Sequence, residues 1–75
     1  MKVEFFGQLA ELAGAASLDV SEVDSVVALK KWLGEKYPSM SAIGYMVAVN
    51  KEMAEGDISL SAEDHIALMP PFSGG

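Results

Sequence analysis

Apolar and polar side chains alternate with a period of two along several stretches of the chain, which predicts β-strands. The first stretch puts Val3 and Phe5 on one face and Phe6 on the other, and Gly7 ends it. The last strand ends before Pro70, which has no N–H to donate to a neighbouring strand. The predicted strands cover residues 1–6, 16–20, 45–50, a short stretch from Met53, and residues 65–69.

One long helix is predicted between the second and third strands, because apolar residues recur there at three- and four-residue spacing. Asp24 or Ser25 can cap its first N–H groups, and Pro38 forces it to stop by the preceding residue. Residues 8–13 can form a short helix, and residues 39–44 are expected to be a loop. The apolar face of the long helix consists of Val26, Leu29, Leu33 and Tyr37.

The order strand, strand, helix, strand, short strand, strand predicts an α+β domain with a mixed sheet packed on one main helix. The pattern does not determine the order of the strands in the sheet. We expect residues 1–69 to form the single folded domain and residues 70–75 to form an extended tail. A domain of this size buries only about 60–65% of its unfolded surface, so we expect its functional site on the surface or at a terminus.

The charge pattern argues against several classes of partner. The formal net charge is −6, with five lysines and no arginine, so the chain lacks the basic clusters that follow nucleic-acid phosphates. An acidic surface instead favours a basic partner protein, or simply solubility. No apolar run approaches the roughly 18 residues of a membrane span, and we expect a cytoplasmic protein.

The sequence contains no cysteine, which excludes disulfides, thiolate metal sites and a cysteine nucleophile. His65 is the one histidine, on an alternating strand, and no second metal ligand lies at useful spacing from it. Glu52, Glu55 and Asp57 match no calcium loop and are expected to form a solvated acidic loop. Trp32 is expected to be an anchor in the core or at its flank. We therefore expect neither a metal site nor turnover of a substrate by the isolated chain.

The tail carries the strongest functional pattern. Two prolines favour an extended rod, a phenylalanine can anchor in a partner's groove, and two glycines can enter a channel too narrow for side chains. The terminal carboxylate of such a tail is sterically open, and activation as an acyl-adenylate by ATP would allow a sulfur nucleophile to convert it to a thiocarboxylate. The predicted tail residues are Pro70, Pro71, Phe72, Ser73, Gly74 and Gly75.

Three segments of the chain resemble the small subunit of molybdopterin synthase, in the wider family of ubiquitin-like sulfur carriers. The ending Pro-Pro-Phe-Ser-Gly-Gly is similar to the family's diglycine tail and is the most specific of these features. The resemblance covers the whole chain. The segments are residues 2–7 with 11–14, residues 47–50, and residues 64–75.

The resemblance implies a β-grasp fold and a non-catalytic role as a sulfur donor that binds no cofactor of its own. A ubiquitin-activating-enzyme-like adenylyltransferase would use ATP to activate Gly75. The tail would then enter the large catalytic subunit of molybdopterin synthase, in a heterotetramer, and donate sulfur to precursor Z. The implied contact surface consists of Phe6, Met53 and Met69, with Phe72 along the tail.

Other functions remain open at this point. A sulfur carrier for thiamin synthesis would use the same Gly75 chemistry, although such carriers are usually shorter and lack the proline pair. A ubiquitin-like modifier would be joined to lysines through Gly75. A simple binding module would have an inert tail.

Overall fold

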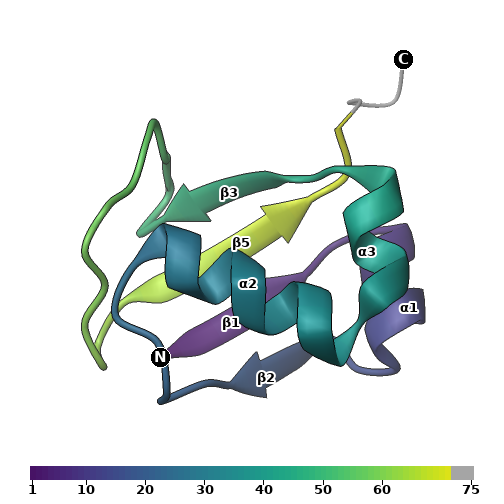
Figure 1. Ribbon diagram of the computed structural model, residues 1–75, viewed down its shortest axis with the longest axis horizontal. Helices are drawn as coiled ribbons and strands as arrows, with labels where there is room; N and C mark the ends of the chain where they lie inside the picture. Colours follow the sequence, from purple (N-terminus) through teal and green to yellow (C-terminus); the bar gives the residue numbers. More distant parts are fainter. Residues whose placement is uncertain (72–75) are drawn as a thin grey trace.

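The computed structural model describes residues 1–71 and shows a five-stranded sheet with one long helix lying across one of its faces (Figure 1). All predicted strands are present, and the short helix after the first strand is confirmed. The elements in chain order are β1 (Lys2–Phe5), α1 (Gln8–Ala13), β2 (Ser17–Asp19), α2 (Val26–Lys36), α3 (Pro38–Ile43), β3 (Met46–Val49), β4 (Glu52–Met53) and β5 (His65–Met69).

The sheet has the strand order β2-β1-β5-β3-β4, so the first and last strands lie next to each other in its centre. These two strands are parallel, with Val3 opposite Ile66 and Phe5 opposite Leu68, whereas the other pairs are antiparallel. A mixed sheet with parallel terminal strands at its centre, crossed by one main helix, is the β-grasp arrangement. The predicted α+β class and β-grasp fold are confirmed.

Helix α2 begins where the sequence allows two caps, and the structure selects one of them. The Ser25 hydroxyl accepts a hydrogen bond from the Ala28 N–H at 3.1 Å, so Ser25 is the N-cap. The predicted apolar face packs onto the sheet, with only Tyr37, at the C-cap, half-exposed. The fully enclosed side chains of the core are Val3, Leu9, Leu29, Leu33, Met40, Ile66 and Leu68, each with 0% exposure.

The expected loop at residues 39–44 is wrong, because this segment forms helix α3. Pro38 does end α2, but it also occupies the first turn of α3, a position where the missing N–H costs nothing. Met40 of α3 is fully buried, and this burial stabilises the helix. Helices α2 and α3 approach closely at Gly34, where a Cβ atom would lie 3.3 Å from the Ser41 hydroxyl oxygen.

A tight turn joins β3 to β4. Asn50 and Lys51 both have positive φ angles, 51° and 73°, as required by the two-residue hairpin turn that matches the twist of the strands. The turn predicted at these two residues is therefore confirmed. Within residues 1–71, no helix is long and apolar enough to cross a membrane.

Candidate functional site

Strand β5 leads directly into the tail, and its end is held by the turn after β1. The Phe6 N–H donates a hydrogen bond to the Leu68 carbonyl at 3.0 Å, which extends the central parallel ladder. The Pro70 ring lies over Gly7, since a Cβ atom on Gly7 would be 3.0 Å from the Pro70 Cγ. Gly7 has a φ of 59° and a ψ of −136°, a combination that side-chain-bearing residues rarely adopt.

The two central strands thus fix the position of Pro70, the first residue of the predicted tail. Pro70 is half-buried and Pro71 is exposed. Because β1 and β5 run parallel, Pro70 and Pro71 follow β5 at the end of the sheet opposite to Met1 (Figure 1). The remaining predicted tail residues, Phe72, Ser73, Gly74 and Gly75, lie outside the residues that the structure describes.

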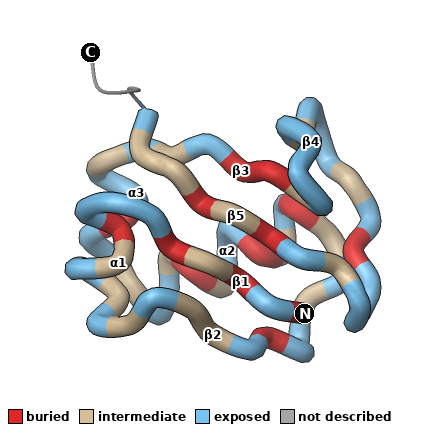
Figure 2. Tube along the Cα trace, turned by 180° about the vertical axis from the view of Figure 1, so that it is seen from behind, coloured by how far each residue is buried: buried red, intermediate tan, exposed pale blue. Residues whose placement is uncertain are grey.

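One face of the sheet carries a group of apolar side chains beside the base of the tail. In Figure 2 this face is turned toward the viewer, and α2 lies behind the sheet. The strand register sets Met46 opposite Met69, Ala48 opposite Ala67, and Ala48 opposite Met53, so these side chains share one face. We call this group the outer-face patch; it consists of Phe6, Met46, Ala48, Met53, Ala67 and Met69.

The outer-face patch brings together the three residues for which a partner contact was predicted. Phe6 continues the alternation of β1 and points away from the core residue Phe5. Phe6 is 45% exposed and Met53 is 50% exposed, while Met69 is half-buried. Large apolar side chains exposed together on a sheet face are typical of a binding surface. The partner contact itself stays a prediction.

Sequence reasoning missed three members of the patch. Met46 is 37% exposed, and Ala48 and Ala67 fill the space between the larger side chains. The signal was present in β3 and β5, whose outward positions carry apolar residues where a solvent-facing sheet surface usually carries polar ones.

Polar groups lie on the same face at the end away from the tail. The imidazole of His65 is paired with the Glu4 carboxylate across the two central strands. The Asn50 side chain accepts a hydrogen bond from the His65 N–H at 3.0 Å and donates one to the Asp64 carboxylate at 2.9 Å. The Ser61 N–H also donates to Asp64 at 2.8 Å, and these hydrogen bonds lower the pKa of the Asp64 carboxyl.

The other charged and aromatic candidates have structural roles. In the part of the chain that the structure describes, no three His, Cys, Asp or Glu side chains are close enough to hold a metal ion. Asp57 instead accepts a hydrogen bond from the Val27 N–H in the first turn of α2, at 3.0 Å. Trp32 is half-buried against the core, and its indole N–H donates to the Glu22 carboxylate at 3.1 Å. Of the two positions predicted for Trp32, core or flank, the structure shows the flank.

Comparison with known proteins identifies the family of this chain. Residues 3–75 match the ThiS family, which is nearly the whole chain. This chain belongs to the ThiS family. A human relative, the molybdopterin synthase sulfur carrier subunit, is 32% identical over an alignment of 82 residues that includes 100% of this chain and 93% of the human protein.

Solved structures place this ThiS-family chain among ubiquitin-like proteins. It is similar to small archaeal modifier protein 1 from Methanosarcina acetivorans, with a TM-score of 0.83, 26% identity, and coverage of 99% of this chain and 94% of that one. The same protein from Haloferax volcanii has a TM-score of 0.75 and 30% identity, with 100% and 98% coverage. The predicted membership in the ubiquitin-like carrier family is therefore confirmed.

Proposed function

We propose that this chain is a sulfur carrier for molybdopterin synthesis, and that the carboxylate of Gly75 is the group that carries the sulfur. Two findings from the sequence support the proposal. The chain belongs to the ThiS family over residues 3–75 and is 32% identical to a molybdopterin synthase sulfur carrier subunit. The sequence has no cysteine, so no side-chain thiol can hold the sulfur.

The proposed chemistry has two steps. The Gly75 carboxylate attacks the α-phosphate of ATP, which forms an acyl-adenylate and releases pyrophosphate. A sulfide or persulfide sulfur then attacks the acyl carbon, and AMP leaves with the electron pair of the broken C–O bond. When the donor is a persulfide, a reductant must cleave the remaining S–S bond. The product is a thiocarboxylate, an anionic sulfur nucleophile on a backbone terminus with no side chain around it.

The partners supply the catalysis in this proposal. A ubiquitin-activating-enzyme-like adenylyltransferase binds ATP and forms the adenylate, and the large catalytic subunit of molybdopterin synthase receives the sulfur in a heterotetramer. The chain itself contributes the tail and a surface for docking. The outer-face patch is suited to docking because it is apolar and lies beside the base of the tail, so a partner that covers it is positioned to receive the tail.

The observation that carries the proposal is the arrangement at the end of β5. A central strand, braced by β1, runs into Pro70 and Pro71 directly beside an uncovered apolar surface. A terminus without a role would not require its first residues to be held in place by β1 beside an exposed apolar surface.

Intact-mass analysis tests the proposal. The full chain is incubated with the adenylyltransferase, ATP and a sulfur source, and fragmentation then locates any modification. We expect one oxygen-for-sulfur exchange at Gly75, and none in a matched chain that lacks Gly75. A chain that remains unmodified, or an exchange that persists without Gly75, would refute the proposed chemistry.

Protein modification is the second candidate, favoured by the similarity to small archaeal modifier protein 1 at a TM-score of 0.83. In this case a lysine amine, rather than sulfide, would attack the activated Gly75. Trypsin would leave a long remnant, because the last lysine of the chain is Lys51 and there is no arginine. Chymotrypsin can cut after Phe72 and leave Ser-Gly-Gly on a modified lysine. Finding such remnants in cells would support this function, and their absence in cells that express the chain would count against it.

A further inference from the structure

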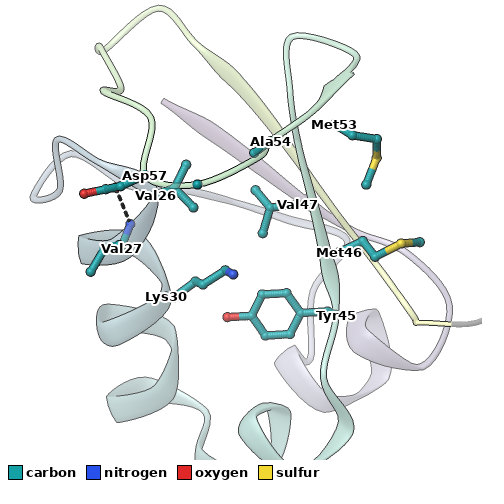
Figure 3. Close-up of a pocket in the computed structure, with 10 residues that line it drawn as sticks. Val26, Val27, Lys30, Tyr45, Met46, Val47, Met53, Ala54 and Asp57 are labelled. Carbon is teal, nitrogen blue, oxygen red and sulfur yellow. Dashed lines mark hydrogen bonds between the residues drawn. The ribbon is translucent and has the colours of Figure 1, made fainter.

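A groove follows the open edge of the sheet between α2 and β3 (Figure 3). Its volume is about 440 Å³, and its apolar lining includes Val26 of α2, Val47 of β3 and Ala54 after β4. A second hollow of about 300 Å³ shares Lys30 and Tyr45 with it and continues toward the end of α3. The two hollows adjoin each other at Lys30 and Tyr45, an arrangement that suits an extended chain better than a compact small molecule.

The wall of this groove contains strand edge that β4 does not cover. Strand β4 pairs only with Ala48 and Val49, and one further hydrogen bond, from the Ala54 N–H to the Val47 carbonyl at 2.9 Å, ends the hairpin. Along β3 the backbone N–H and C=O groups of successive residues point alternately toward β5 and away from it. The Asn50 N–H points toward β5, because it donates to the His65 carbonyl at 2.8 Å. The Val47 N–H and the backbone of Tyr45 therefore point away from β5, toward the groove. Among the described residues, the hairpin reaches this part of the edge only through the bond from Ala54 to the Val47 carbonyl.

The groove also offers a site for a negative charge. Figure 3 shows the Lys30 side chain reaching into it from α2 and the Tyr45 side chain from the residue just before β3. Burial raises the pKa of the Tyr45 hydroxyl, so this group remains a hydrogen-bond donor at neutral pH. Asp57 lies at the other end, where its carboxylate accepts the Val27 N–H. Among the described residues, Lys30 is the one basic side chain that lines the two hollows, and it lies with Tyr45 where the hollows meet.

We infer that the groove binds an extended segment of a partner protein, which adds a strand to the open edge of β3 and places an acidic side chain at Lys30 and Tyr45. The segment's backbone bonds with the Val47 N–H and the Tyr45 backbone, and its apolar side chains contact Val26, Val47 and Ala54. The partner differs from a second copy of this chain, because two copies that each carry a net charge of −6 repel one another. The surface is distinct from the outer-face patch and meets it only at Met46 and Met53.

Peptide selection against the full chain tests this inference. Random peptides displayed on phage are selected on the immobilised protein, and the strongest binder is synthesised with its acidic residue and with the matching amide. We expect enriched peptides to alternate apolar residues around an aspartate or glutamate. In amide NMR spectra they should shift Tyr45, Met46 and Val47 and slow the hydrogen exchange of the Val47 N–H. The amide form should bind about tenfold more weakly.

Two substitutions on adjacent helix positions provide a matched control. Lys30→Glu reverses the charge in the groove and should weaken peptide binding at least about tenfold. Lys31→Glu makes the same change at an exposed neighbour that does not line the groove, and should change binding by less than about twofold.

Four results would overturn the inference: no enriched peptide, equal effects of the two variants, amide shifts confined to the outer-face patch, or a concentration-dependent dimer of the unliganded chain that Lys30→Glu abolishes. None of these results bears on sulfur loading at Gly75, so the inference can fail while the proposed function holds.

Discussion

Replacing Phe6 with serine should weaken binding to a partner and leave the fold intact. Phe6 lies on the outer-face patch with 45% of its surface exposed, while the core residue before it is 4% exposed. A fully buried phenylalanine removes about 200 Å² of surface from water, so a partner that covers the patch would bury roughly 90 Å² of Phe6 that is still exposed. At about 25 cal/mol per Å² this area contributes about 2 kcal/mol to binding, which corresponds to a roughly 30-fold change in affinity.

Calorimetric titration of the full chain with the large catalytic subunit of molybdopterin synthase measures this effect. The matched control is Val27→Ser, because Val27 is 58% exposed but belongs to α2, on the opposite side of the sheet. We expect Phe6→Ser to bind about 30-fold more weakly and Val27→Ser to bind within about twofold of the original chain. Thermal unfolding should show both variants folded. Unchanged binding by Phe6→Ser, or an equal loss in both variants, would refute the assignment of the outer-face patch as the docking surface.

Three further predictions concern the fold and its charges. Leu68→Ala removes a fully enclosed side chain and should lower the free energy of unfolding by about 2–5 kcal/mol in urea titrations; a loss below about 1 kcal/mol would contradict the described packing. Ser25→Ala should cost about 1 kcal/mol because it removes the cap of α2, and Asp24→Ala should cost less; equal losses would show that the capping hydroxyl contributes nothing. Hydrogen bonds from Ser61 and Asn50 lower the pKa of the Asp64 carboxyl, so its contribution to stability is present at neutral pH and is lost as the pH falls below about 4. The free energy of unfolding should therefore fall less steeply toward acidic pH in Asp64→Asn than in the original chain, and an unchanged slope would count against these hydrogen bonds.

The strands could be predicted from the sequence because burial in this sheet is one-sided. In β5, Ile66 and Leu68 are fully buried while His65 is exposed, so the two-residue period of the sequence reports directly which face packs on α2. The same reasoning found the long helix, since three of the four residues of its predicted apolar face are buried.

Helix α3 could not be predicted from local pattern alone. Pro38 was interpreted as the end of one helix, whereas it also starts the next, because a proline is tolerated in the first turn. A helix of six residues is not stable by itself, and the burial of Met40 against the core provides the missing stabilisation. That contact depends on the tertiary structure and leaves only a weak signal in the sequence.

The candidate site could be predicted in part. Phe6, Met53 and Met69 were placed by family resemblance. The strand register puts Met53 and Met69 on one face, and the alternation that continues from β1 puts Phe6 on the same face. Met46 was not predicted as a member of the outer-face patch, because the pattern of a single strand does not reveal which strands lie beside it. The groove along β3 could not be predicted at all, since it exists only because the hairpin with β4 ends at Ala54.

The most direct test concerns the terminal group itself. Molybdopterin formation is measured in a reconstituted mixture of adenylyltransferase, large subunit, precursor and sulfur source, with either the original chain or a variant that carries one extra alanine after Gly75. We predict that the original chain supports synthesis and that the extended chain supports none, although it still folds and binds the large subunit. Full synthesis with the extended chain would contradict the claim that the Gly75 carboxylate carries the sulfur.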